Sequence, residues 1–437
     1  MQVDKTTLQD LSIIHADEEQ SVFYHLNNTQ TNGGREYLRY ILSKPLDTLA
    51  AITDTQLLIK QLIAIEQEWP VTITNGTIMV VERFFETQIN FYPSHPTVIS
   101  SYYYKIINAA DYSITKYSVE HSHSLLKGFW QILNLLNGTE SKQLQTWLEH
   151  IALMLQRPFV QELLQYDNPK KLTPRQVLYF ANHLRFHFKQ QLFELIDIYN
   201  RLDAYLSLAV ASKKFQFSFP VITETEKPLI TAEALYHLQL KIPVSYNVEL
   251  TQHKNFLFLT GANMAGKSTF IKATGIAVYL AHLGMSVPAK NMQLSLFDGL
   301  LSNIHVVDNI LKGESYFFNE VQRIKKTVEK INDGKKWLIL IDELFKGTNV
   351  QDAMKCSTTV IEGLRKMQNV LFVLSTHLYE IGDDLKKHSN IQFKYFETSI
   401  KDDELEFSYQ LKEGISNDRL GYLILRKEGV VEMLEKL

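Results

Sequence analysis

Apolar residues in the first half of the chain recur mostly at three- and four-residue steps, the spacing of one face of an α-helix. A break at Thr31–Gly34 precedes a predicted helix that Pro45 ends, and Asp47 is the expected cap of the next helix. Residues 120–156 have the pattern of a helical hairpin. We therefore predict that residues 1–215 form a mostly α-helical domain.

The longest periodic stretch begins at Thr173-Pro174, a cap followed by a first-turn proline, and continues to Ala209. Its length of about forty residues corresponds to roughly 60 Å of helix. We interpret it as one long helix that acts as a spacer; the alternative is two shorter core helices with an unmarked break. His183 and His187 on this stretch are four residues apart, but without a third ligand we favour ordinary surface histidines over a metal site.

Aromatic residues are dense at Phe91, Tyr92 and Tyr102–Tyr104. Such a cluster can stack on nucleic-acid bases. Because no arginine lies close by in the sequence, we favour packing in a hydrophobic core.

Beyond Phe215 the pattern changes to short, strand-like apolar runs, so we place a domain boundary near 215–225 and predict an α/β domain over residues 216–437. The predicted entry strands of this domain are residues 219–223, 234–240, 244–250 and 256–259.

The last of these strands leads directly into a segment with the spacing G-x-x-x-x-G-K-[ST]. Its glycines let successive N–H groups point at phosphate oxygens, and the following helix directs its positive end to the same place. Lys267 can reach the β- and γ-phosphates, and the Ser268 hydroxyl can bind Mg²⁺. A chance glycine loop is the alternative, which the flanking strand and helix disfavour. The expected nucleotide-binding residues are Gly261, Ala262, Asn263, Met264, Ala265, Gly266, Lys267, Ser268 and Thr269.

Two further apolar strands end in polar residues that suit the same chemistry. Residues 337–341 end in Asp342 and Glu343, of which the first can hold Mg²⁺ through water and the second can act as general base on the attacking water. Residues 370–374 are followed by His377, which can hydrogen-bond the γ-phosphate or that water. The alternative for the carboxylates is a simple strand end at the surface.

Ser315 follows Gly313 and would open a helix that starts at Tyr316, which predicts a second anion site. One phosphate loop is already present in the chain, so the candidate ligand is the γ-phosphate bound by a partner subunit in a dimer that encloses two ATP molecules. The alternative is an ordinary serine cap without a ligand.

Together these segments resemble the MutS family of ABC-type ATPases. The family's TGPNMGGKST is similar to TGANMAGKST at 260–269, and its ATH to Ser375–His377. Its signature loop is similar to a segment that keeps Asp308, Asn309, Gly313, Ser315, Phe317 and Glu320. Further matches are FKGTNVQDA after Glu343, the closing Gly414–Gly421, and in the first half Asp4–Leu11, Thr31–Leu38 and Leu202–Ala209, which resemble the start of the family's core domain and the end of its lever helix.

The resemblance implies a helical core/lever domain followed by an ATPase domain, with ATP and Mg²⁺ as cofactors. By the same resemblance Lys267, Glu343 and His377 are the expected catalytic residues, Ser268 and Asp342 the expected Mg²⁺ ligands, and Ser315 the residue that acts across a homodimer.

The sequence also departs from the family. The core-like segment begins at Asp4, so we expect neither the mismatch-reading nor the connector domain, and only a reduced clamp within about 70–170. Tyr316 follows the signature serine, and Lys346 stands where the family has arginine. We therefore expect an ATP-driven clamp or switch that acts on DNA non-specifically, in repair or recombination, with mismatch recognition doubtful. The alternative is a switch that acts on another macromolecule such as the ribosome.

Composition and charge exclude some classes of protein. The formal net charge is −3, so bulk charge does not indicate nucleic-acid binding. Cys356 is the single cysteine, which rules out an intrachain disulfide and fits a reducing compartment. The sequence has neither a signal-peptide pattern nor an apolar run long enough to span a membrane. We expect a cytoplasmic protein with no membrane partner.

Overall fold

A computed structural model describes residues 1–89, 92–93, 95–304, 316–401, 404–416, 426 and 430–435. The chain forms two compact units. We call the unit of residues 26–43 and 54–213 the helical unit, and the unit of residues 1–25, 44–53 and 214–437 the mixed unit. The mixed unit thus includes two segments from the first half of the chain, and the predicted domain division at residue 215 stays a prediction.

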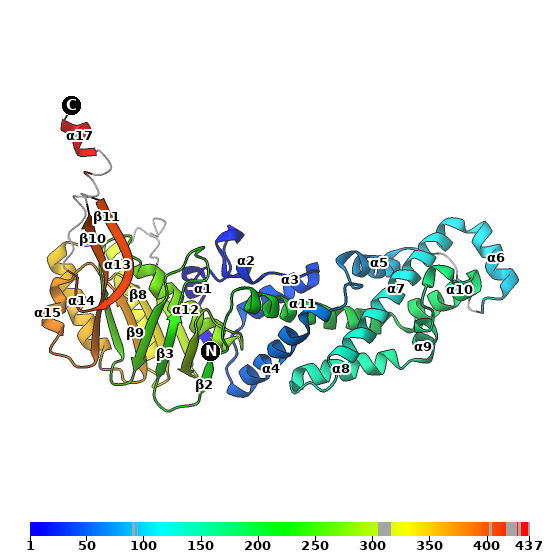
Figure 1. Cartoon of the computed structure of the whole chain (residues 1–437), viewed down its shortest axis with the longest axis horizontal. Coiled ribbons are helices and arrows are strands. Elements are labelled where there is room, and N and C mark those ends of the chain that lie inside the picture. The colour runs from blue at the N-terminus through cyan, green and yellow to red at the C-terminus, as the bar shows by residue number, and fades with distance from the viewer. Residues whose placement is uncertain are drawn as a thin grey trace. The chain divides into compact units, whose positions relative to one another are not determined.

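The helical unit is built from helices throughout its described part (Figure 1). Its α4 begins in the mixed unit. The helices are α3 (Asn32–Ser43), α4 (Leu49–Ile65), α5 (Asn75–Glu86), α6 (Val98–Ile107), α7 (Ala109–Leu135), α8 (Lys142–Leu155), α9 (Pro158–Leu164), α10 (Pro174–Asn182) and α11 (Lys189–Lys214).

The prediction of one helix from Thr173 to Ala209 is wrong, because the structure divides this stretch into α10 and α11. A π-helical turn at His183–His187 follows α10, and Phe188 leaves the helical region with φ −133°. The wider turn accompanies a contact of Arg185, whose guanidinium donates to the carbonyl oxygens of Phe84 at 2.6 Å and Thr87 at 2.5 Å. The predicted start is confirmed, since Thr173 caps α10 in a capping box.

A buried carboxylate joins the two ends of the helical unit's sequence. Asp203 on α11 accepts hydrogen bonds from the backbone N–H of Gln30 and from both the N–H and hydroxyl of Thr31. A side chain at Gly34 would meet the Asp203 carboxylate at 2.2 Å, so glycine permits this close approach. The segments Thr31–Leu38 and Leu202–Ala209, which carried part of the resemblance, therefore contact each other.

The cap of α4 differs from the prediction. Thr48, not Asp47, provides the side chain, since its hydroxyl accepts from Ala51 N at 3.3 Å. The predicted hairpin is confirmed as α7 and α8. The aromatic cluster is divided: Tyr92 and Tyr104 are buried as predicted, whereas Tyr102 and Tyr103 are exposed. Phe91 lies outside the described residues.

The mixed unit has two sheets in its described residues. The larger sheet has the order β1-β7-β8-β9-β5-β10-β11, in which only the β10–β11 pair is antiparallel; the smaller has the order β2-β6-β3-β4. The larger sheet consists of β1 (Gln2–Val3), β7 (Gly299–Asn303), β8 (Trp337–Asp342), β9 (Val370–Ser375), β5 (Phe256–Thr260), β10 (Ile391–Lys401) and β11 (Glu404–Glu413). The smaller sheet consists of β2 (Val221–Thr223), β6 (Asn291–Ser295), β3 (Leu229–Leu235) and β4 (Tyr246–Thr251).

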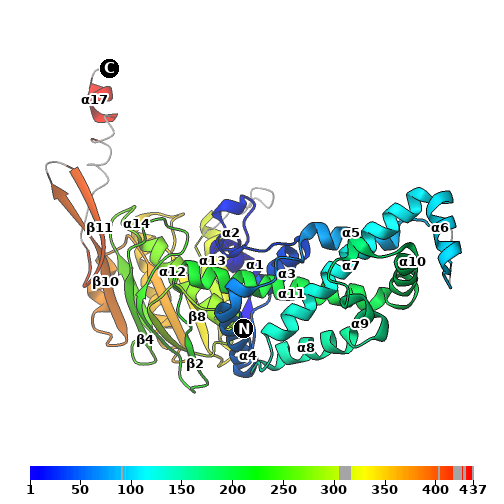
Figure 2. The same ribbon diagram turned by 45° about the vertical axis from the view of Figure 1, so that its right-hand side comes forward.

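Helices cover both faces of the larger sheet, as Figure 2 shows from a second direction. One face packs on α13 (Tyr316–Ile331), α14 (Val350–Leu364) and α15 (Glu380–Leu385) through a buried cluster that includes Phe258, Ile339 and Phe372. The opposite face packs on α12 (Lys267–His282), where the closeness of Gly275 to Leu340 leaves no room for a larger residue. The strands β5, β7, β8 and β9 are buried on both faces, which explains their largely apolar sequences.

The predicted α/β class of the second half is confirmed, and strand positions mostly agree with the predictions. The exception is the strand predicted at 234–240, because β3 ends at Leu235. Its register shifts between Ala232 and Leu235, and Ala234 has a φ of 51°. Among the helices of the described residues, none is long and apolar enough to cross a membrane.

Candidate active site

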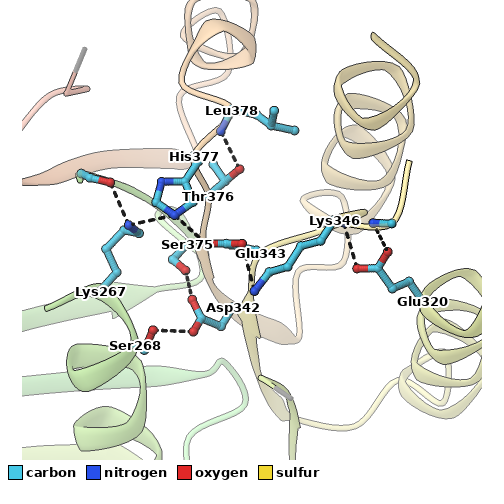
Figure 3. Close-up of polar contacts among 12 residues, drawn as sticks. Lys267, Ser268, Glu320, Asp342, Glu343, Lys346, Ser375, Thr376, His377 and Leu378 are labelled. Carbon is cyan, nitrogen blue, oxygen red and sulfur yellow. Dashed lines mark hydrogen bonds and ion pairs between the residues drawn. The ribbon is translucent and has the colours of Figure 1, made fainter. Parts of the chain in front are cut away.

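The register of three neighbouring parallel strands brings the predicted site residues together. Asp342 at the end of β8 lies opposite Ser375 at the end of β9, and Ser375 lies opposite Leu259 at the end of β5. The loop that follows β5 and the residues that follow β8 and β9 therefore meet at one edge of the sheet. Figure 3 shows their side chains converging there.

The loop after β5 has the backbone conformation that its glycines allow. Gly261 has a φ of +140° and Gly266 a φ of +110°, both in the region that favours glycine. A Cβ added at Gly261 would lie only 3.2 Å from the Phe396 carbonyl oxygen, so the loop passes close to the backbone of β10. Ala265, where the resembled family usually has glycine, is not among the residues with positive φ, so alanine is tolerated there.

Lys267 is the first residue of α12 and is buried. Its Nζ donates to the carbonyl oxygens of Gly261 at 2.8 Å and Ala262 at 2.9 Å, and lies 3.5 Å from His377 Nε2. Burial lowers the pKa of Lys267 to about 8, although the carboxylates of Glu343 and Asp342 oppose the shift. The loop thus holds a cation whose charge is sensitive to mildly alkaline pH.

Asp342 accepts two hydroxyl hydrogen bonds. Ser268 Oγ donates to Oδ2 at 2.5 Å, and Ser375 Oγ donates to Oδ1. A carboxylate and a hydroxyl in contact provide the hard oxygen ligands that Mg²⁺ takes from protein, with phosphate and water completing its coordination. The donor set therefore fits Mg²⁺, which Ser268 and Asp342 would hold. Ser375 was not predicted as a site residue, although its place at the end of a parallel strand is a signal for one.

Glu343 is held at both carboxylate oxygens. His377 Nε2 lies 2.7 Å from Oε1, and Lys346 Nζ lies 2.9 Å from Oε2 (Figure 3). Burial by itself raises the pKa of Glu343, but the hydrogen bonds from His377 and Lys346 outweigh it and lower the pKa to about 2. Glu343 is therefore a firmly ionised carboxylate between two basic side chains.

The loop that carries Lys346 is fixed by a carboxylate from α13. Glu320 accepts from the backbone N–H of Lys346 at 3.1 Å and of Gly347 at 3.2 Å. Glu343 and Phe345 have positive φ values of 63° and 59°, a conformation that non-glycine residues seldom adopt. The backbone around Glu343 is thus bent sharply and tied to α13.

A cavity of about 430 Å³ opens beside the loop. Its polar side includes most of the predicted loop residues and Glu343. Its other side is apolar and aromatic, and sequence reasoning did not identify it. Tyr409, for example, reaches the site only through the pairing of β10 with β11. The cavity is lined by Ala262, Asn263, Met264, Gly266, Lys267, Ser268, Thr269 and Glu343, and on the other side by Leu240, Ile242, Val244, Tyr246 and Tyr409.

Parts of the resembled motifs lie outside the described residues, namely Asp308, Asn309, Gly313, Ser315 and Gly421. The helix predicted to follow Ser315 is present, since α13 starts at Tyr316. The proposed role of Ser315 across a dimer stays a prediction.

A buried parallel strand, a glycine-bent loop with its lysine at a helix start, and carboxylates at the next strand ends define the phosphate-loop class of nucleotide-binding domains. Residues 257–434 match the family model described as MutS domain V, the ATPase domain of MutS proteins. This match includes the loop after β5 and the ends of β8 and β9, and so covers the site described above.

Curated relatives are similar to more than half of the chain. The DNA mismatch repair protein MutS of Streptococcus pyogenes serotype M5 is 28% identical over 249 residues, which are 56% of this chain and 29% of that protein. The DNA mismatch repair protein MSH3 of Candida glabrata is 29% identical over 290 residues, 62% of this chain and 27% of that protein. The matched part of the chain spans less than a third of the length of these relatives.

Proposed function

We propose that this chain binds ATP with Mg²⁺ and hydrolyses it to ADP and phosphate. The observation that carries the proposal is the meeting of Lys267, Ser268, Asp342, Glu343 and His377 at one sheet edge, beside a cavity. The polar side of that cavity suits a triphosphate, and the side with Tyr246 and Tyr409 suits a flat base. The match of residues 257–434 to MutS domain V supports the same activity.

Each polar residue has a proposed task. Lys267 and the loop N–H groups bind phosphate oxygens, and Ser268 and Asp342 hold Mg²⁺, which when bound neutralises phosphate charge. Glu343 orients the attacking water and accepts its proton, and His377 is close enough to exchange hydrogen bonds with both Lys267 and Glu343. A carboxylate with a pKa of about 2 is a weak base, so release of one basic partner would strengthen it.

We further propose that the helical unit is a MutS-like core/lever domain and that two copies of the chain close over two ATP molecules. The contact of Thr31–Leu38 with the Leu202–Ala209 segment supports the first part, because both segments resemble that domain. The hydrogen bond from Lys346 to Glu320 on α13 supports closure of two copies over ATP. Helix α13 directly follows Ser315, the residue predicted to contact the ATP of the partner subunit, so this bond links that region to the loop beside Glu343. Closure around ATP would shift α11, and hydrolysis would release it.

DNA is the proposed client, and the reason is that the relatives are named DNA mismatch repair proteins. The formal net charge of −3 argues for local rather than global phosphate contacts. Repair or recombination is therefore the proposed setting, in the cytoplasm.

Turnover of ATP by the full chain tests the enzymatic proposal. We expect phosphate release by the wild type, and loss of ATP binding in Lys267→Met because the buried cation is removed. The matched control is Lys335→Met, which removes an exposed lysine from a loop of the same unit. Equal ATP binding by wild type and Lys267→Met would contradict the proposal.

The client is tested by the ATPase rate with duplex, branched and mismatched DNA, and separately with ribosomes. We expect DNA to change the rate, and its binding to weaken as salt is raised. Stimulation by ribosomes without any response to DNA would reject DNA in favour of the alternative client.

A further inference from the structure

Helix α6 of the helical unit presents an unusually apolar outer surface. Its inner residues, Ser101 and Tyr104, are buried where α6 packs on α7 and α10. Its outer residues are exposed, with Ile99 at 84%, Ile106 at 74% and Tyr103 at 66%. We call the outer set the α6 patch: Val98, Ile99, Tyr102, Tyr103, Ile106 and Ile107.

The α6 patch has the size of a protein interface. A large side chain offers roughly 150–250 Å² when fully exposed, so these six at their exposed fractions present on the order of 700 Å². The largest apolar patch on a typical monomer is about 300–600 Å², and a standard interface buries about 800 Å² per partner. Because its residues follow each other at three- and four-residue steps, the patch forms ridges that another helix can pack against.

Charges around the patch favour a second copy of the same surface. Lys105 is the one charged residue of α6 and lies in its last turn. At the other end, Val98 and Tyr102 line a hollow of about 530 Å³ together with Glu162, Arg175 and Tyr179. If two α6 helices pack antiparallel about a twofold axis, the carboxyl-terminal half of each helix meets the amino-terminal half of the other. Lys105 then faces the acidic Glu162 of the second copy.

We propose that α6 pairs with α6 of a second copy of this chain, as a contact between helical units that goes beyond the proposed ATP-dependent dimer. A nucleic acid is a poorer occupant, because Lys105 on α6 and Arg175 in the hollow are the cations named at this surface, Glu162 lies beside them, and a run of phosphates would need more positive charge. The twofold pairing also predicts that residues at the middle of α6, such as Tyr103, lie near their own counterparts.

Cysteine cross-linking tests this geometry on the full chain. In a Cys356→Ser background, which has no other cysteine, we expect Tyr103→Cys to form a disulfide-linked dimer under mild oxidation without added ATP. Val71→Cys is the matched control, because Val71 is likewise exposed in the helical unit, at 78%, but lies outside α6. Adding Lys267→Met should leave the cross-link unchanged, so failure of the ATPase proposal and failure of this one are distinguishable.

Charge reversal supplies a second, independent measurement. In sedimentation experiments we expect Lys105→Glu or Glu162→Lys alone to weaken self-association by at least about threefold, and the double variant to restore it. Ile106→Asp should weaken it by at least about tenfold, whereas Val71→Asp should not.

Two results would overturn the proposal. The first is equal, low cross-linking of Tyr103→Cys and Val71→Cys together with monomeric wild-type protein. The second is binding of a fluorescent single-stranded oligonucleotide that Ile106→Asp abolishes, which would assign the α6 patch to bases.

Discussion

Two acidic side chains, one in each unit, differ in how the protein holds them. Asp203 in the helical unit accepts hydrogen bonds from neutral donors, the N–H groups of Gln30 and Thr31 and the Thr31 hydroxyl. Glu343 in the mixed unit lies between the basic side chains of His377 and Lys346. Both are largely removed from solvent, yet burial raises the pKa of Asp203, whereas the basic partners of Glu343 lower its pKa to about 2.

The difference separates a structural carboxylate from one that is proposed to take part in the reaction. Neutral donors reduce the cost of burying Asp203 without compensating its charge, and their value is that they join α3 to α11. Basic partners stabilise the ionised form of Glu343, and each of them can pair with another acidic group instead. The carboxylate of Glu343 can therefore change its partners. Replacement of Asp203 should therefore affect stability, and replacement of Glu343 should affect turnover.

The largest expected effect is on ATP turnover. Glu343→Gln keeps the shape of the side chain but removes the proposed base, so we expect kcat to fall by about 10²- to 10⁴-fold while ATP still binds. Single-turnover hydrolysis and nucleotide binding should be measured on the same preparation. Undiminished turnover with intact binding would show that Glu343 is not the base.

Replacement of Asp203 is expected to lower stability. Asp203→Ala leaves the Thr31 and Gln30 donors without their acceptor, which should lower the free energy of unfolding by about 2–4 kcal/mol in urea titrations. Asp197→Ala on the same helix is the control, because its pair with Arg201 is exposed and should contribute no more than about 0.5 kcal/mol. Equal losses for the two variants would remove the distinction drawn for Asp203.

ATP affinity should depend on pH through Lys267. Its pKa of about 8 means that above this pH the lysine is increasingly neutral and must take up a proton when it binds phosphate. We expect the Kd for ATP to rise by up to about tenfold per pH unit above pH 8, as far as the pKa in the complex. Lys267→Arg, which stays charged, should give a flatter profile. A wild-type Kd for ATP that stays constant up to about pH 9.5 would contradict this prediction.

The smallest expected effect concerns Lys346. Lys346→Met removes one basic partner of Glu343, so the pKa of Glu343 should rise and its strength as a base should increase, with kcat higher by about two- to fivefold. The wild-type ion pairs also contribute stability that is present above about pH 4.5 and lost as pH falls toward about 2, and the variant should lose part of it. Lys346→Arg should behave as wild type; a lower rate in Lys346→Met would mean that the lysine assists the reaction.

The sequence predicted which polar residues meet at one edge of the sheet, because these residues are local to strand ends. Lys267, Asp342, Glu343 and His377 each follow an apolar run within a few positions, and parallel strands bring such ends together. Tyr409 could not be predicted in the same way, since its position depends on a register shift between Phe396 and Thr398 in the β10–β11 pair. The break before α11 was also hidden, because a π-helical turn keeps the apolar spacing nearly unchanged.

The three-segment construction of the mixed unit has a consequence for how the chain folds. Residue Gln2 pairs with Gly299, and Asp10 accepts hydrogen bonds from Ser302 and Ile304, so these contacts span almost 300 positions of sequence. During synthesis the first strand has no partner until that distance has been translated, whereas the contacts of the helical unit lie within residues 26–213. Contacts of such long range form slowly, so the helical unit should fold first and the β1–β7 contact should be among the last to form.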